Sequence, residues 1–453
     1  MALKKSLKGC NNLKTIVNSV VLIVLWVMVP ASALGAEYDY IDIRNPYLRK
    51  LPIAIPVFAP MDNLSTEEAM ADESTRLFSK YLDFTSYFQM IDPEAFLEDP
   101  SRTGITTDAI AFHNWTAVGA ELLVTGGVRY DESSGLLQME LRLFDTLKGK
   151  LLVGKLYKGK AGDERRMVRR FASEVIHALT GDWGIFDSRI AFVSNGTGHK
   201  EIFISDFDGN NPRQWTRHNS ITLSPAWSSD GKWLAYTSFA KGNPDLYIKH
   251  IKEKRGIVLS KKGIHTSPSW VPGQFALAAT LSFSGDPEIY LLTGNAKIIK
   301  RITKKWGIDE SPTWSPDGRK VAFVSNRSGS PQIYIKTIDT GQVDRLTFLG
   351  RYNTQPSWSP QGKRIAFAGL EDGQINIYVI GADGKDLFQL TRDSGDNESP
   401  SWAPDGSLIT FSSTREGVSR IYVMTAYGTD QRRLLILSGK QSSPAWSPRV
   451  VSN

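Results

Sequence analysis

The sequence predicts an N-terminal α+β domain followed by an all-β, six-bladed β-propeller that is closed by the C-terminal strand. Two observations predict the propeller. A Ser-Pro-x-Trp motif recurs six times, once with glutamine in place of serine, and short β-rich runs separate successive copies. Intervals of 43, 44, 44, 44 and 44 residues separate the tryptophans of these copies, Trp227, Trp270, Trp314, Trp358, Trp402 and Trp446. A period this regular is typical of a repeat architecture.

Each repeat has the same order of segments. The motif is followed by a tight turn such as Pro-Asp-Gly at 316–318, where proline presets φ and glycine tolerates a positive φ. Two β-rich runs then follow, for example VAFVS at 321–325 and IYIKT at 333–337, and a short piece such as RLT at 345–347 ends the unit. Four short strands without a helical period describe one blade of a propeller.

The two ends of the repeat region predict how the ring closes. The first unit, at 189–210, has two β-rich runs but no motif before them, and the last motif, at 443–446, has only 447–453 after it. We expect the C-terminal segment to supply the inner strand of the first blade, which would leave no free sheet edge. The tryptophans are expected to fill the gaps between neighbouring blades.

The N-terminus has the pattern of a secretory signal peptide over residues 1–36. Basic residues precede an apolar run at 16–29, and small residues suitable for cleavage after Ala33 or Ala36 follow it. The alternative is an uncleaved membrane anchor, but about 14 apolar residues are few for a span that needs about 20. Export is therefore expected.

Removal of residues 1–36 changes the charge and the redox chemistry of the chain. Four lysines and the single cysteine, Cys10, leave with this segment, so that 50 basic and 47 acidic residues remain, a balance of +3. Such a balance gives little support to nucleic-acid binding. An exported chain without cysteine cannot form disulfides, which favours the periplasm of a Gram-negative bacterium as its location.

Residues 51–185 are expected to form the α+β domain, residues 37–50 an extended tail before it, and residues 186–453 the propeller. Ser65 and Glu68 have the spacing of a capping box, and Gly181 is placed to end the last helix. The predicted helices cover 65–82, 106–119 and 163–181, and the predicted strands cover 53–58, 121–130, 137–145 and 151–158.

The sequence lacks the common motifs of catalysis and cofactor binding. It has no G-x-S-x-G, no phosphate-binding G-x-x-x-x-G-K-[ST] and no H-E-x-x-H, and its six histidines lack metal-ligand spacing. We therefore expect no enzymatic activity, no cofactor and no metal. Two alternatives stay open: a hydrolase or lyase with its site in the propeller channel, and a sensor that binds a small ligand at the channel mouth.

The loops that enter the inner strands should share one rim of the propeller and form a protein-binding surface. Pockets of propellers concentrate at the channel mouth, where hydroxyl and amide groups could satisfy the backbone of an inserted peptide. The alternative is that the serines only cap the strands. The candidate residues are Ser224, His265, Ser267, Asp309, Glu310, Ser311, Arg351, Gln355, Glu398, Ser399 and Ser443.

Three further segments, together with the six motifs, resemble the TolB family, the periplasmic component of the Tol–Pal system of Gram-negative bacteria. These segments are PIAIPVF at 52–58, NWTAVGAELLVTGGV at 114–128 and LTGDWGIFDSRIAFVS at 179–194. The resemblance implies a monomeric, non-enzymatic scaffold that acts in outer-membrane invagination during cell division and in outer-membrane integrity.

The resemblance also implies the partners. The lipoprotein Pal would bind at the channel mouth, near Ser267, Glu310, Ser311 and Ser399, and other envelope proteins could also bind. The C-terminal domain of the inner-membrane protein TolA would bind the tail. This sequence departs from the family in its tail and at Arg169 and Arg170. The expected TolA-binding residues are Glu37, Tyr38, Asp39, Tyr40, Ile41, Asp42, Ile43 and Arg44.

Overall fold

The structure is a computed structural model that describes residues 49–62, 64–98, 104–283 and 285–450. All of these residues belong to one compact unit, which spans Asp42–Asn453. The expected signal peptide and the residues of the expected TolA-binding tail lie outside the described residues. In the described part of the chain, no helix is both long enough and apolar enough to cross a bilayer.

The N-terminal region contains one mixed β-sheet with the strand order β3-β1-β4-β5-β6, and β2 pairs with β4. β1 runs parallel to β3 and β4, whereas β4, β5 and β6 form the predicted antiparallel meander. The strands are β1 (Leu51–Ala54), β2 (Ala59–Pro60), β3 (Phe88–Met90), β4 (Leu122–Asp131), β5 (Leu136–Asp145) and β6 (Lys150–Lys160).

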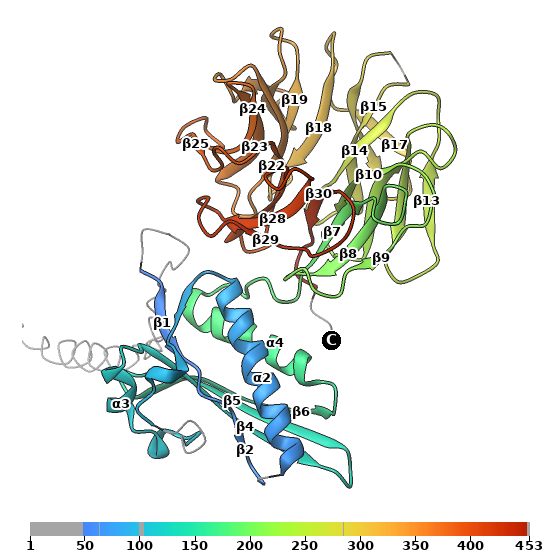
Figure 1. Ribbon diagram of the computed structural model, residues 1–453. Helices are drawn as coiled ribbons and strands as arrows, with labels where there is room; N and C mark the ends of the chain where they lie inside the picture. The colour runs from blue at the N-terminus through green and yellow to red at the C-terminus, as the bar shows by residue number, and fades with distance from the viewer. Residues whose placement is uncertain (1–48, 63, 99–103, 284, 451–453) are drawn as a thin grey trace, which may run out of the picture. The chain divides into compact units, whose positions relative to one another are not determined.

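Two long helices, α2 (Ser65–Phe84) and α4 (Glu164–Thr180), lie side by side over one face of this sheet (Figure 1). The rings of Phe78 in α2 and Phe171 in α4 are 5.5 Å apart, and both side chains are fully buried. As predicted, α4 ends at Gly181, which has a φ of 76° and donates its N–H to the carbonyl of His177.

Three local predictions in this region are wrong. The strand expected over 53–58 ends at Ala54, because Pro56 has no N–H to donate to a neighbouring strand. The helix expected over 106–119 is a 3₁₀ turn at Thr107–Ala109 followed by α3 (Phe112–Ala117). Between these two pieces, the buried residue Ile110 is extended.

The third wrong prediction is the capping box at the start of α2. Leu64 is the N-cap residue, Ser65 is the first helical residue, and no side chain caps the helix. The functional acid is Glu67 rather than Glu68. The Glu67 side chain is fully buried and accepts hydrogen bonds from the N–H groups of Asp62 and Tyr130, at 2.8 and 2.7 Å.

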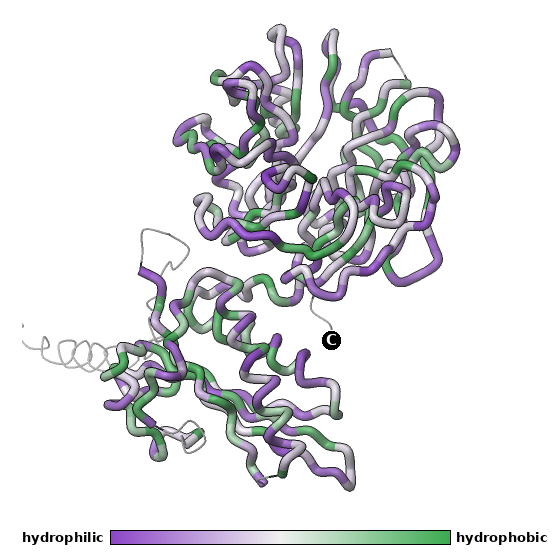
Figure 2. The backbone as a smooth tube through the Cα atoms, in the orientation of Figure 1, coloured by the Kyte–Doolittle hydropathy of each residue, from purple (hydrophilic) through white to green (hydrophobic). Residues whose placement is uncertain are grey.

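The propeller consists of six four-stranded antiparallel sheets, as the sequence predicts. Hydrophobic residues follow its strands, and hydrophilic residues follow many of its loops (Figure 2). The first strands of the blades contact one another in a closed ring and are called the inner strands. They are β10 (Thr222–Trp227), β14 (His265–Trp270), β18 (Asp309–Trp314), β22 (Tyr352–Trp358), β26 (Asn397–Trp402) and β30 (Gln441–Trp446).

The other strands follow the inner strands in order, blade by blade, from the inside outward. The second strands are β11 (Trp233–Ser238), β15 (Ala276–Leu281), β19 (Lys320–Ser325), β23 (Arg364–Glu371), β27 (Leu408–Ser413) and β7 (Arg189–Ser194). The third strands are β12 (Asp245–His250), β16 (Glu288–Thr293), β20 (Gln332–Thr337), β24 (Gln374–Gly381), β28 (Arg420–Thr425) and β8 (Glu201–Asp206). The fourth strands are β13 (Gly256–Leu259), β17 (Ile298–Arg301), β21 (Val343–Arg345), β25 (Phe388–Gln389), β29 (Arg432–Arg433) and β9 (Arg213–Gln214).

The C-terminal strand closes the ring, which confirms the prediction. β30 pairs antiparallel with β7, so that Gln441 is opposite Ser194 and Trp446 is opposite Ile190. The indole N–H of Trp446 donates to Oγ of Ser188, at 2.8 Å. The last repeat of the chain and its first blade therefore form one sheet.

The six tryptophans fill the gaps between blades, as predicted, and each is only 6–8% exposed. Trp270, for example, packs against Ala235 and Leu246 of the preceding blade. In four copies, the indole N–H donates to the carbonyl of the residue that precedes the tryptophan of the preceding blade. These bonds join Trp227 to Ala445, Trp270 to Ala226, Trp314 to Ser269 and Trp402 to Ser357.

Candidate functional site

Each inner strand contains a β-bulge at its Ser-Pro or Gln-Pro pair. In β18, Glu310 is opposite Val324 and Thr313 is opposite Ala322, so Ser311 and the proline after it face a single residue of β19. Bulges bend a strand and redirect its side chains. The residue before the proline has a φ of 49–55° in all six strands, at Ser224, Ser267, Ser311, Gln355, Ser399 and Ser443.

A left-handed conformation costs a residue other than glycine about 1–2 kcal/mol. Its presence at six equivalent places therefore needs compensation by neighbouring groups. Gln355 provides one such contact, because its Oε1 accepts the N–H of Ser399 in the next blade at 2.7 Å. The N–H of Ser311 donates in the same way to Oγ1 of Thr280, at 3.3 Å. The predicted ring of motif residues is thus a ring of bulges linked between blades.

The bulges lie near the channel mouth, defined here as the end of the ring at which the inner strands begin. At this end, the first residues of an inner strand donate backbone N–H groups to the preceding blade. Asp309 donates to the carbonyl of Pro287, and His265 donates to that of Pro244, at 2.9 and 3.0 Å. Each loop that enters an inner strand therefore adjoins the loop between the second and third strands of the preceding blade.

Two of the candidate residues, His265 and Asp309, have buried side chains. His265 is 0% exposed, its Nδ1 is 3.3 Å from the carbonyl oxygen of Pro244, and burial lowers the pKa of its imidazole. Asp309 is 2% exposed and both of its oxygens accept from Arg327, at 3.0 and 2.8 Å. Desolvation raises the pKa of Asp309, although Ser325 and Arg327 oppose the shift. The structure places both side chains beneath the rim.

Two carboxylates at the mouth remain open to a partner, Glu310 in β18 and Glu398 in β26. Glu310 is half-buried, and desolvation by the surrounding channel wall raises its pKa. Desolvation, followed by the charge of Asp396, raises the pKa of Glu398. Both carboxylates also raise the pKa of the phenol of Tyr352 in β22, after desolvation. An acidic spot therefore spans three successive blades.

The comparisons with known proteins agree with this architecture. The TolB amino-terminal domain matches residues 39–152, and the TolB β-propeller domain matches residues 176–450. The chain belongs to the TolB family. The Tol-Pal system protein TolB of Desulfosudis oleivorans is 56% identical to it over 288 residues, 64% of this chain and 65% of that protein. The protein TolB homolog of Chlorobaculum tepidum is 42% identical over 59% of each chain. The alignments thus span about three fifths of the length of these relatives.

A solved structure shows the same fold over most of the chain. The crystal structure of TolB from Acinetobacter baumannii matches with a TM-score of 0.77 and 27% sequence identity. The match covers 88% of this chain and 97% of that structure. TolB-family proteins of the Tol-Pal system are envelope components of Gram-negative bacteria, so this chain is assigned to the same system and to the cell envelope.

Sequence reasoning missed a buried polar cluster that supports the mouth of this TolB-family propeller. In the third blade, Oγ1 of Thr303 donates to Glu288 at 2.5 Å and accepts the N–H of Ile289 at 2.9 Å. The signal was the threonine that recurs in the short fourth segment of the repeats, as in RLT and QLT. The equivalent pairs are Thr216 with Glu201, Thr347 with Gln332 and Thr391 with Asn376.

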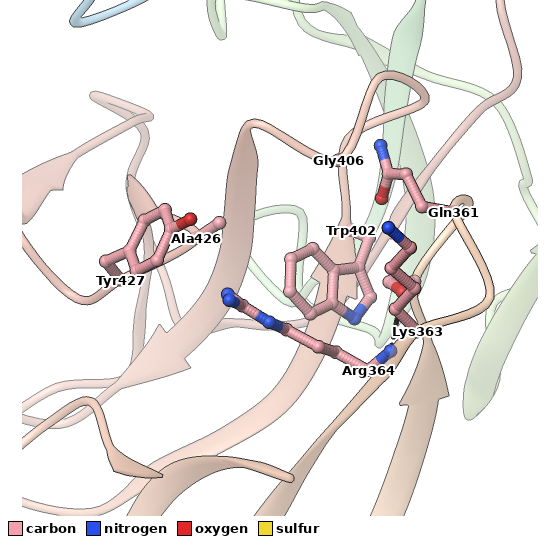
Figure 3. A pocket seen from close by; sticks show the side chains of 8 residues that line it. Gln361, Lys363, Arg364, Trp402, Gly406, Ala426 and Tyr427 are labelled. Atoms are coloured by element: carbon pink, nitrogen blue, oxygen red, sulfur yellow. Dashed lines mark hydrogen bonds between the residues drawn. The ribbon is translucent and has the colours of Figure 1, made fainter. Parts of the chain in front are cut away.

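A hollow of about 200 Å³ lies between two blades of the TolB-family propeller, beside the turns that follow the inner strands (Figure 3). Trp402 forms its wall, and the guanidinium of Arg364 lies 4.9 Å from the ring of Tyr427. Its lining consists of Ser359, Gln361, Lys363, Arg364, Trp402, Gly406, Ala426 and Tyr427, which include no carboxylate and no histidine. Acid–base catalysis therefore finds no paired groups in this hollow.

In the residues that the structure describes, no group of three His, Cys, Asp or Glu side chains is arranged to hold a metal ion. His218, one of the two histidines in the loops before inner strands, has its Nε2 3.0 Å from the hydroxyl of Tyr236. The lowered pKa of His218 results mainly from desolvation and then from the charge of Lys249. A neutral packed imidazole accounts for this contact.

Proposed function

We propose that this TolB-family protein is a non-enzymatic, monomeric periplasmic scaffold that links Pal at the outer membrane to TolA at the inner membrane. In this role it contributes to outer-membrane invagination during cell division and to outer-membrane integrity. The observation that supports the proposal most is the ring of six bulges around a channel mouth that carries Glu310 and Glu398. The name of the 56%-identical relative assigns that relative to the Tol-Pal system.

At the mouth, the proposed division of labour follows from burial. Glu310, Arg351 and Glu398 would contact Pal directly, together with the six bulge residues. His265 and Asp309 would hold the inner strands in place, because their side chains are 0% and 2% exposed. Each bulge presents a strained backbone segment that a partner can contact without prior rearrangement, which lowers the entropic cost of binding.

Reversal of both carboxylates, Glu310→Arg with Glu398→Arg, is expected to weaken Pal binding at least tenfold. Two charge contacts at a partly desolvated rim account for a loss of this order, since about 1.4 kcal/mol corresponds to a factor of ten. Isothermal titration calorimetry with purified Pal measures the affinity. The control is Glu132→Arg with Asp339→Arg, an equal charge change at exposed positions elsewhere. An affinity equal to that of the control would exclude the rim as the Pal site.

Deletion of 37–44 is expected to abolish binding of the TolA C-terminal domain. The alternation of polar and apolar residues in this segment suits addition of a strand to the edge of a partner's sheet. A pull-down with purified TolA domain measures the effect, with Pal binding measured in parallel to show that the propeller is intact. Capture of the TolA domain at full strength by the truncated chain would refute the assignment of the tail.

A further inference from the structure

One sector of the channel mouth combines exposed apolar side chains with exposed cations. This sector, called the basic apolar sector below, spans the loops that enter β14, β18 and β22 and the loop after β15. Its apolar members are Ile264, Phe283, Trp306, Ile308, Phe348 and Leu349. Its cations are Lys261, Lys262, Lys304, Lys305 and Arg351, all of which are exposed. Trp306 is 88% exposed, and Phe348 and Leu349 are 70% and 68% exposed.

Backbone contacts join these loops into one surface. The N–H of Gly307 donates to Asp286, and that of Asp309 donates to Pro287, so the loop that carries Trp306 adjoins the loop that carries Phe283. Lys261 reaches the same place, because its Nζ lies 5.1 Å from the centroid of Phe283. The loops that follow β15, β19 and β23 project from the same end of the propeller (Figure 1).

The cations of this sector are available to a ligand. Neighbouring arginines are already committed, Arg301 to Glu288 and Arg327 to Asp309. Within the described ranges, by contrast, none of the five cations of the sector forms an ion pair. The remaining part of the mouth has the opposite charge and carries Asp393, Asp396 and Glu398 in the loop that enters β26. A negatively charged surface would therefore approach the mouth from one side only.

The combination of tryptophan, phenylalanine and lysine indicates the chemistry of the occupant. Protein–protein interfaces are depleted in lysine, and four of the five cations here are lysines. Tryptophan and lysine are instead the residues that anchor proteins at the surface of a bilayer, where the ring lies among the headgroups and the ammonium contacts phosphate. The most exposed residue of the sector, Trp306, directly follows two of these lysines.

We propose that the basic apolar sector binds the surface of a bilayer that contains anionic phospholipid. Trp306, Phe348 and Leu349 enter the headgroup region, and the five cations contact lipid phosphates. Weak, reversible attachment is expected, since interfacial binding scales with the buried apolar area and with the charge attraction to anionic lipids. This inference is independent of the proposed binding to Pal and TolA, because it concerns different side chains and a lipid ligand.

Flotation with phospholipid vesicles tests the proposal. The protein used starts at Glu37, because the apolar segment 16–29 would enter bilayers on its own. We expect binding to vesicles of phosphatidylcholine with 30% phosphatidylglycerol, at least tenfold weaker binding to phosphatidylcholine alone, and weaker binding at 0.5 M salt. Absence of binding to the anionic vesicles would overturn the proposal.

Variants separate the sector from the rest of the mouth. Trp306→Ser with Phe348→Ser, and separately Lys304→Gln with Lys305→Gln, should each weaken vesicle binding at least tenfold. The matched control is Ile436→Ser with Lys440→Gln, which changes a 93% exposed isoleucine and an exposed lysine in the loop that enters β30. Equal losses in the control would overturn the assignment to this sector. Loss of Pal affinity in the Trp306 and Phe348 variant, with vesicle binding unchanged, would identify the sector as a protein-docking surface and would also overturn the proposal.

Discussion

Replacement of Trp446 by alanine is expected to lower the free energy of unfolding by about 3–5 kcal/mol, the range measured for large-to-small changes of buried aromatic residues. Trp446 is 7% exposed and packs in a cluster that includes Ile190 and Leu408. Its indole N–H also donates to Ser188, so truncation leaves a buried hydroxyl without its donor. Because Trp446 ends the strand that closes the ring, the cavity would weaken the contact between the first and last blades.

Chemical denaturation followed by circular dichroism measures this effect. The matched control is Trp306→Ala, which removes the same side chain from a position that is 88% exposed and should change the free energy of unfolding by less than about 0.5 kcal/mol. Equal stability of the two variants would contradict the view that the closing strand depends on its tryptophan. Unchanged vesicle binding by Trp446→Ala would show in addition that the mouth tolerates this cavity.

Replacement of Arg327 by methionine is expected to destabilise the fold by about 3–5 kcal/mol near neutral pH, because it leaves the Asp309 carboxylate buried without its partner. Asp309 accepts two hydrogen bonds from Arg327, and the two side chains are 2% and 16% exposed. The guanidinium also lies 4.9 Å from the ring of Tyr334. Methionine keeps part of this packing, so the loss reports mainly on the charge.

The pH dependence of this variant gives an independent check. Desolvation already raises the pKa of Asp309 in the folded protein above its ordinary value of 3.8, and removal of Arg327 should raise it further. An acid with a raised pKa in the folded state binds protons more tightly when folded, so stability is regained as the pH falls through that pKa. The deficit of Arg327→Met should therefore shrink on acidification. A deficit that grows with acidification would contradict this account.

The fifth and sixth blades supply a rescue experiment. The residues equivalent to Asp309 in these blades are Asn353 and Asn397, which are buried and neutral. Addition of Asp309→Asn to Arg327→Met should recover most of the lost stability, because no charge is then left without a partner. Arg351→Met, at an exposed arginine of the next loop, is the control and should have little effect.

The propeller could be predicted from the sequence because its signal is long and periodic. Six tryptophans at intervals of 43 or 44 residues define the blades, and the position of the last motif after the last complete repeat predicts the closure. The ends of short elements were less predictable. Ser65 and Glu68 have capping-box spacing, but the buried Glu67 contacts Asp62 and Tyr130 through contacts that are distant in sequence. Such tertiary contacts override local preference.

The candidate site could be located from the sequence but not resolved into contacting and supporting residues. His265 and Glu310 both lie just before a motif proline, and the sequence treats them alike, yet His265 is buried and Glu310 is half-buried. The side to which a residue points depends on the bulge, and the bulge follows from the left-handed conformation of the serine or glutamine. The exposure of Trp306 could not be predicted either, because the other named tryptophans of the repeats are core residues.

The pairing of β30 with β7 has a consequence for synthesis on the ribosome. Ser188 meets its partner Trp446 only after another 258 residues have been added. At roughly 5–20 residues per second, this takes about 10–50 s. Throughout that interval, β7 has a vacant edge and the nascent chain cannot complete its fold. A polypeptide that must thread through a secretion channel in an extended state benefits from such a delay, since the final step of folding waits for the very last segment to be translated.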